Sequence, residues 1–398
     1  MTHNKKPQLL RNVVFLGLIS LFTDLSTEMV YPFIPLYLTM VLGATPALVG
    51  VIEGIAESVA SLLKVFSGYV SDRFQKKKLL AFIGYAPGIL YKLALILAGT
   101  WAGVLGARVI DRIGKGIRTA PRDVLVSEST DKDNMGRAFG IHKALDKSGA
   151  ALGILIAFFI LLAMGGSFDF KLIFWLSIIP AAIGLCLFFF VTEKKVAQPT
   201  KEREPFWKNA RKIDGQLRLY LFVTLLFTLG NSSNAFILLK AYAIGFDTVN
   251  VILLYFIYNA VASILSIPLG RLSDHIGRKT LLVGGYIVFA LCYLGFAFAP
   301  NPGIMIFSFV LYGVYTAMII GVERAYVAEI APPELKGTML GLQATIVGVA
   351  LLPASIIAGV LWEVFGSAMP FIFGSCLSLA AALVLMLFMR NRHVYKAK

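Results

Sequence analysis

Charged side chains lie inside apolar stretches of the first half of the sequence. Asp24 and Glu28 are four residues apart in one such stretch, so a helix would place both on one face. Arg108, Arg112 and Asp146 lie in later stretches. Low-dielectric surroundings favour a neutral carboxyl group, whereas a nearby cation favours the ionised form. Carboxyl groups beside arginines can therefore take up and release protons, or bind a charged solute.

The apolar stretches of the second half carry uncharged polar side chains instead. The candidates for contact with a solute are Asn231, Asn234, Tyr258, Asn259 and Tyr312. We expect a cavity between the two halves, with one wall that moves protons or charge and another that holds an amphipathic solute.

The elements that position these residues are membrane-spanning helices. Of 398 residues, 58% are hydrophobic and 15% are charged, whereas soluble domains average about 25% charged residues. A bilayer core requires about 20 apolar residues per helix. Twelve candidate spans follow: 13–40, 47–70, 79–99, 101–119, 137–163, 170–191, 217–241, 249–270, 280–299, 303–328, 338–361 and 367–389.

The basic residues indicate the orientation. Most of the 37 lysines and arginines lie at the termini and in loops on one side of the twelve spans, whereas the opposite loops hold Lys171 and Lys240. The positive-inside rule places both termini in the cytoplasm, which predicts a multi-pass protein of the cell (inner) membrane. This distribution explains the net charge of +15 without nucleic acid as a partner.

Two loops are nearly copies of each other. Gly68, Asp72 and Arg73 lie at and just after the end of the second span. Gly270, Asp274 and Arg278 lie at and just after the end of the eighth, about half the chain later. The repeat predicts two pseudo-symmetric six-helix halves, 1–191 and 217–398, joined by a polar cytoplasmic linker at 192–216.

These glycine-aspartate-arginine loops resemble the signature of the major facilitator superfamily, and the resemblance covers the whole chain. It implies an all-α fold of twelve transmembrane helices, a secondary transporter, and a monomer. It also assigns a gating role to Gly68, Asp72, Arg73, Gly270, Asp274 and Arg278. Glycine would let helices approach closely at the cytoplasmic face.

An acidic residue in the first helix and an arginine in the fourth resemble the drug/proton antiporters of this family. The resemblance implies Asp24, Glu28 and Asp146 as proton carriers. Further charged groups, Arg108, Arg112, Asp111 and Glu57, would modulate them or contact the substrate. Proton-coupled export of a small amphipathic or anionic compound is therefore the first interpretation.

Helix geometry leaves structural alternatives for these charges. Asp24 could be a fixed partner of Arg112, and Glu53 and Glu57 could pair with Lys92 or Lys64. Asp111 and Arg112 are adjacent and point about 100° apart, so we expect only one of them to face the cavity.

Two further expectations concern packing and chemistry. Gly149 and Gly153 are spaced for a close-packing seam between the halves. Three cysteines and four histidines at unrelated spacings predict neither a metal site nor a cofactor.

Two rival functions stay open. One is a proton-coupled importer or uniporter of an organic anion or metal chelate. The other is a non-transporting scaffold or enzyme on the same fold, for which the sequence offers no convincing nucleophile–base pair.

Overall fold

The computed structural model describes residues 6–74, 76–130, 135–164, 169–193, 215–319, 321–331 and 336–389. Within these ranges the regular structure is helical throughout, with no strand. Most of the predicted linker, 192–216, lies outside the described residues, so the boundaries of the halves stay a prediction.

The first half contains six spans. The helices are α1 (Lys6–Val30), η1 (Tyr31–Phe33), α2 (Ile34–Leu36), η2 (Tyr37–Val41), α3 (Pro46–Phe74), α4 (Lys77–Tyr85), α5 (Pro87–Leu97), α6 (Trp101–Glu128), α7 (Met135–Ala163), α8 (Phe170–Cys186) and η4 (Leu187–Phe190). The first span is α1 to η2, the third is α4 with α5, and the sixth is α8 with η4.

The second half repeats this pattern. Its helices are α9 (Gly215–Gly230), α10 (Ala235–Ala243), α11 (Thr248–Ile276), α12 (Arg278–Phe298), α13 (Pro302–Ile319), α14 (Val322–Ile330), α15 (Lys336–Phe365) and α16 (Met369–Phe388). Eleven spans among the described residues are long and apolar enough to cross a membrane. The twelfth is α6, which is long enough but rich in charged residues.

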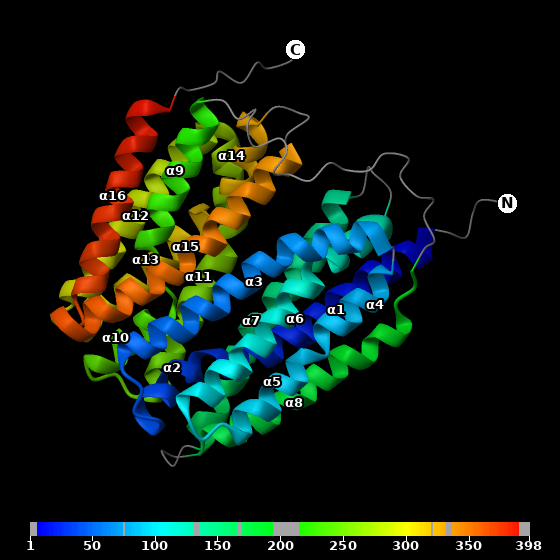
Figure 1. Ribbon diagram of the computed structural model, residues 1–398, viewed down its shortest axis with the longest axis horizontal. Coiled ribbons are helices and arrows are strands. Elements are labelled where there is room, and N and C mark those ends of the chain that lie inside the picture. The colour runs from blue at the N-terminus through cyan, green and yellow to red at the C-terminus, as the bar shows by residue number, and fades with distance from the viewer. Residues whose placement is uncertain are drawn as a thin grey trace.

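The two halves lie side by side with their helices roughly parallel (Figure 1). The first turn of α1 and the last turn of α16 lie at the same end of the bundle, which we call the terminal end. The fold is the predicted one: an all-α membrane protein with twelve spans in two six-helix halves.

Glycines on α3 let the halves approach each other. A Cβ on Gly50 would meet the backbone carbonyl of Ser355 on α15, and one on Gly54 would lie 2.9 Å from the Leu352 oxygen. Ser58 of α3 donates a hydrogen bond of 2.6 Å to the Gly348 carbonyl. The α3–α15 seam is therefore the main contact between the halves.

Close packing at Gly149 and Gly153 is confirmed, but the prediction that it joins the two halves was wrong. Cβ atoms at these positions would meet the backbone of Leu21 and Leu25 on α1, so the glycines pack α7 on α1 within one half. Small residues show that a helix packs closely, but the sequence does not say against which neighbour.

Two interrupted helices meet at mid-depth. Pro32 and Pro35 remove backbone donors after α1, and the chain continues as the short helices η1, α2 and η2. Residues 231–234 separate α9 from α10. Such interruptions leave polar groups free for a solute, and in transporters they border the binding site.

Candidate substrate cavity

A cavity of about 460 Å³ lies between the halves. From the first half, it is lined by residues of α1, α3, α6 and α7; from the second, by Asn234, Tyr255, Tyr258, Asn259 and Arg324. The lining runs from Glu28 near mid-depth to Lys64 and Arg122 toward the terminal end. The cavity has the predicted charged wall and the predicted amide and aromatic wall.

Among the acidic groups in the lining, Asp24 and Asp146 form a close pair. Their side chains lie within hydrogen-bonding distance of each other, α1 to α7. Lys143 donates to the same Asp146 carboxylate from one turn earlier. Two carboxyl groups in this contact cannot both be ionised without strong repulsion, so the pair is suited to hold one proton.

Glu28 lies one turn beyond Asp24 and reaches the other half. The Tyr255 hydroxyl of α11 donates a hydrogen bond of 3.2 Å to Glu28 Oε2. Lys115, Lys147 and Arg112 interact electrostatically with the same carboxylate. Glu28 therefore links the basic wall of the cavity to the aromatic wall.

Arg108 is not part of the cavity lining. Its Nη2 donates a bond of 2.7 Å to Glu53 Oε2, and the two side chains are 0% and 1% exposed. Ser233 donates to the same oxygen at 3.1 Å, and the Tyr31 ring lies 5.3 Å from the guanidinium. The predicted pairing of Arg108 with the acids of α1 is replaced by a buried bridge between α6 and α3.

Arg112 and Asp111 both line the cavity, although the sequence suggested that only one would. Arg112 Nη2 lies 2.9 Å from Glu57, and its Nε lies 3.7 Å from the Asp111 carboxylate. A long side chain can turn back along its helix, so the direction of Cα–Cβ does not fix where the charge lies. Glu53 and Glu57 thus pair with arginines of α6, which overturns the alternative of Lys92 and Lys64.

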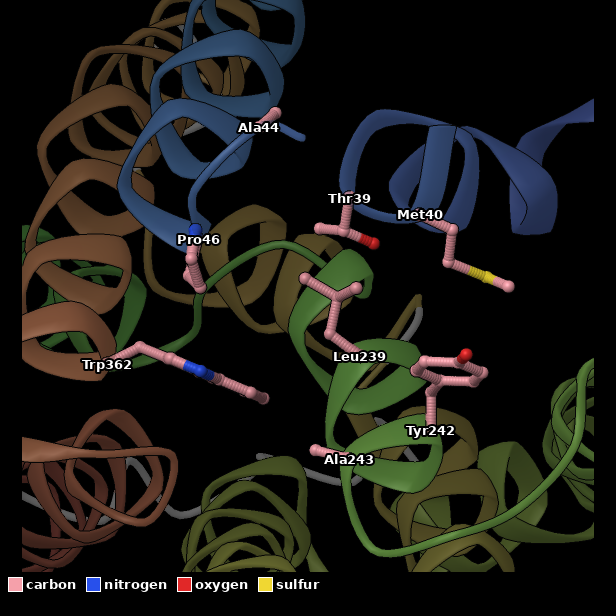
Figure 2. A pocket seen from close by; sticks show the side chains of 8 residues that line it. All are labelled: Thr39, Met40, Ala44, Pro46, Leu239, Tyr242, Ala243 and Trp362. Atoms are coloured by element: carbon pink, nitrogen blue, oxygen red, sulfur yellow. The ribbon is translucent and has the colours of Figure 1, made fainter. Parts of the chain in front are cut away.

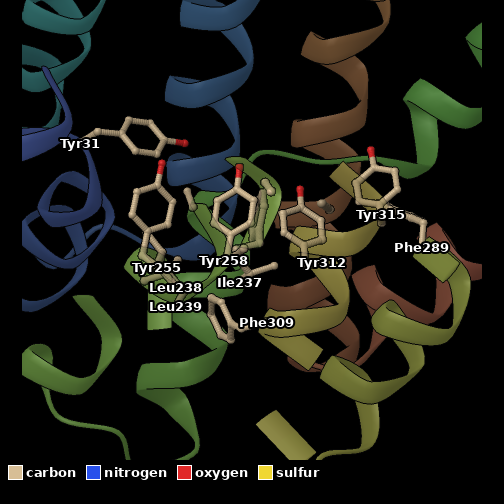
Figure 3. Packing of buried hydrophobic residues seen from close by; sticks show 14 of the residues in the cluster. Tyr31, Ile237, Leu238, Leu239, Tyr255, Tyr258, Phe289, Phe309, Tyr312 and Tyr315 are labelled. Atoms are coloured by element: carbon tan, nitrogen blue, oxygen red, sulfur yellow. The ribbon is translucent and has the colours of Figure 1, made fainter. Parts of the chain in front are cut away.

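Four tyrosines of the second half form a continuous row, which we call the tyrosine row: Tyr255, Tyr258, Tyr312 and Tyr315. Tyr255 and Tyr258 line the cavity, and the other two continue the row beyond it. Figure 3 shows their hydroxyl groups on the same side, away from Ile237 and Leu238 of α10. Neighbouring ring centroids are 5.0–5.4 Å apart.

The break between α9 and α10 supplies amides to the tyrosine row. Tyr312 donates a bond of 2.7 Å to Asn234 Oδ1, and Asn234 Nδ2 donates to the Tyr258 hydroxyl at 3.4 Å. Asn231 Nδ2 donates to the Tyr315 hydroxyl at 3.0 Å. Asn234 and Tyr258 line the cavity, whereas Asn231 and Tyr312 lie outside the lining. Tyr312 supports Asn234 through its hydrogen bond, and Asn231 bonds to Tyr315.

Asn259 lines the cavity and donates to the Tyr255 carbonyl within α11. Tyr255 itself was not among the predicted site residues, although its position three residues before Tyr258 places both on one helix face. That spacing was the signal in the sequence that could have found it.

The predicted gating loops are described in part. Helix α3 includes the backbone of Gly68, Asp72 and Arg73, but the surroundings of these three residues lie outside what the structure describes. In the second copy, Arg278 lies 3.4 Å from Asp274 and 2.8 Å from Glu329. A Cβ on Gly270 would meet no described atom within 4 Å, so none of the described helices approaches closely there.

A second pocket of about 490 Å³ lies at the opposite end of the molecule. Thr39 and Met40 of η2 face Leu239 and Tyr242 of α10 across it, and Trp362 of α15 lies on its far side (Figure 2). No described residue lines both this pocket and the cavity. The second pocket and the cavity are therefore distinct hollows between the two halves.

A polar cavity at mid-depth between two six-helix halves defines a membrane transporter of small molecules rather than an enzyme. The chain belongs to the major facilitator superfamily: the model of the Major Facilitator Superfamily matches residues 16–247 and 220–398.

Relatives and solved structures agree with this assignment. The chain is 37% identical over 388 residues to an uncharacterized MFS-type transporter of Methanocaldococcus jannaschii, covering 95% of each chain. It is 38% identical over 128 residues to a multi-drug resistance efflux pump PmrA homolog of Lactococcus lactis, covering 32% of this chain and 31% of that one. The crystal structure of the nucleoside transporter NupG has a TM-score of 0.78 at 12% identity, covering 96% of this chain and 100% of that one.

Proposed function

We propose that this protein is a proton-coupled secondary transporter of a small organic solute. The observation that supports this most directly is the acidic pair, Asp24 and Asp146, beside Glu28 in a polar cavity between the halves. A carboxyl group in a membrane costs about 2.5–3.5 kcal/mol at the bilayer centre, so three acids here favour a functional role.

The proton would be held by the carboxyl groups of the cavity. In the proposed cycle, Asp24 and Asp146 share a proton, and Glu28 gains or loses one as its neighbours Lys115 and Lys147 move or become neutralised. Asn234, Tyr258 and Asn259 hold the polar part of the solute. Arg112, with Asp111 and Glu57, keeps the charge of this wall balanced.

Alternating access would move one half against the other. The cavity lining extends toward the terminal end, while the second pocket marks the place where an entrance could open at the other end. The lysine and arginine distribution favours a cytoplasmic terminal end in the cell membrane, so this conformation would face inward. The Ser233–Glu53 hydrogen bond joins the halves and would break as they move.

Two directions of transport are candidates. Export by exchange against protons is supported by the names of relatives, which include a multidrug resistance protein MdtH of Photorhabdus laumondii. Import of an organic anion together with protons is supported by the excess of basic over acidic side chains in the cavity, several of which form no close ion pair among the described residues. We propose the monomer as the working unit in both cases.

Purified protein in liposomes tests the proposal. With an imposed pH gradient and a panel of radiolabelled solutes, we expect flux of at least one solute to depend on the gradient and to carry protons. Solute flux that is the same with and without the gradient would replace proton coupling by facilitated diffusion.

A further inference from the structure

Eight basic and six acidic side chains line the cavity, and several of the basic ones form no close ion pair within the described ranges. The lining residues that form no ion pair in the described part of the chain are Lys64, Lys115, Arg118, Lys147 and Arg324. Arg112, Arg122 and Lys143, by contrast, each pair with a carboxylate. The unpaired group is drawn from four helices and both halves of the molecule.

Two of these cations line the same cavity from different halves. Lys64 of α3 and Arg324 of α14 belong to different halves and repel each other electrostatically, with Lys115 as a further like charge within range. Movement of the halves toward each other at this end would increase the repulsion. A multivalent contact with an anion between them would remove it.

Arg118 provides an independent observation. It lines the cavity and is only 4% exposed, yet its Nη1 has no hydrogen-bond partner among the described residues. The guanidinium lies 4.7 Å from the centroid of the Tyr85 ring, which fixes its position. A buried donor without an acceptor is costly, so the arrangement is suited to a ligand that brings an acceptor.

We propose that the transported solute is a soluble organic anion, which binds with its acidic group among Lys64, Lys115 and Arg324. Its body extends toward Asn234, Tyr255 and Tyr258, whose amide and hydroxyl groups favour a hydroxylated or aromatic body. The anion contacts both halves, which couples its binding to their movement. This inference rests on the proposed transport function and specifies its substrate class.

The position of Glu28 also indicates whether the anion and the proton travel together or are exchanged. Its carboxylate faces Lys115 and Arg112 of α6, Lys147 of α7 and Tyr255 of α11, with Asp24 one turn away on its own helix. A bound anion neutralises these cations and adds a negative charge nearby. Glu28 therefore takes up a proton as the anion binds, and by linkage each ligand strengthens the binding of the other. Anion and proton travel together, which favours co-transport over exchange.

Three matched probes test the charge preference: 4-hydroxybenzoate, 4-hydroxybenzamide and 4-hydroxybenzylamine. Binding is measured by equilibrium dialysis on protein in nanodiscs of zwitterionic phosphatidylcholine. We expect the carboxylate to bind about tenfold or more tightly than the amide, and the amine to bind weakest. Preferred binding of the amine or the amide would overturn the proposal.

Charge-removing variants locate the site. Lys64→Gln and Arg324→Gln should each weaken carboxylate binding by about tenfold and leave amide binding within about twofold. Lys171→Gln is the matched control, since Lys171 lies at the start of α8, outside the cavity. Equal carboxylate affinity in all three variants would overturn the site. A lipid head group is the competing source: glycerol phosphate binding as tightly as 4-hydroxybenzoate would assign the cations to anionic lipid.

Proton movement on binding distinguishes failure of the anion proposal from failure of the proposed proton-coupled transport. In weakly buffered solution with a pH indicator, 4-hydroxybenzoate binding should cause net proton uptake, and Glu28→Gln should abolish it. Proton release would overturn the inference that anion and proton travel together, while leaving proton coupling intact. Carboxylate binding without any proton movement would overturn the coupling and with it the proposed function, but not the anion preference.

Discussion

Glu53 of α3 and Arg108 of α6 form an ion pair of 2.7 Å between Oε2 and Nη2, and both side chains are buried. Ser233 of the other half donates to the same carboxylate. The pair therefore holds two helices of the first half together and accepts one hydrogen bond from the second half. When the halves separate, that hydrogen bond breaks while the ion pair stays within its own half.

Glu53→Gln should lower the stability of the protein, because it leaves the buried Arg108 charge with only the more distant Asp111 carboxylate, 4.0 Å away, as a counter-charge. Removing one partner of a buried pair costs about 3–5 kcal/mol. Thermal unfolding in detergent measures the loss. Glu363→Gln is the control, since Glu363 is exposed near the end of α15, and it should shift stability by about 0.5 kcal/mol or less. Equal unfolding temperatures for the two variants would show that Arg108 finds another partner.

Asp24→Asn should abolish proton-driven solute flux and leave solute binding in place, because the amide cannot take up a proton but fits the same space. The measurement is gradient-driven uptake in liposomes, together with equilibrium binding. Asp247→Asn is the matched control, since Asp247 caps α11 outside the cavity and Asn caps helices equally well. Full gradient-driven flux in Asp24→Asn would remove Asp24 from the mechanism.

Gly50→Ala and Gly149→Ala should have different effects, although both place a Cβ against a helix backbone. At Gly50 the obstacle is Ser355 of the other half, so the variant should disfavour this conformation and expose the opposite end. At Gly149 the obstacle is Leu21 of the same half, so the cost of about 1–3 kcal/mol should appear as lost stability.

Labelling of a cysteine at position 39 reports access at the opposite end, and thermal unfolding reports stability. Gly106→Ala is the control, because no described atom lies within 4 Å of its added Cβ. If Gly50→Ala changes only the stability, and labelling at position 39 is the same as without the substitution, then the contact at Gly50 does not control the opening of the opposite end.

Asp72→Ala should change the balance between inward- and outward-facing states more than Asp274→Ala does. Asp274 is exposed and lies 3.4 Å from Arg278, and exposed pairs contribute about 0–1 kcal/mol. Labelling of cysteines near the terminal end, compared in the two variants, measures the balance. A larger change in Asp274→Ala would show that the second loop, not the first, contributes more to gating.

The sequence by itself determined the class of fold. Apolar stretches long enough for a bilayer have few alternatives to helices, since every backbone donor must be satisfied within the segment. The repeated loops at Asp72 and Asp274 determined the two halves. The concentration of charges before residue 150 and of amides and tyrosines after residue 230 predicted the two walls of the cavity.

Only the tertiary structure decided which charge meets which. Arg108 pairs with Glu53 rather than with an acid of α1, Asp24 meets Asp146, and Glu28 reaches Tyr255 of the other half. Helix periodicity fixes which residues share a face within one helix. The neighbour of that face depends on packing across hundreds of residues, and a long flexible side chain adds several further ångströms of reach.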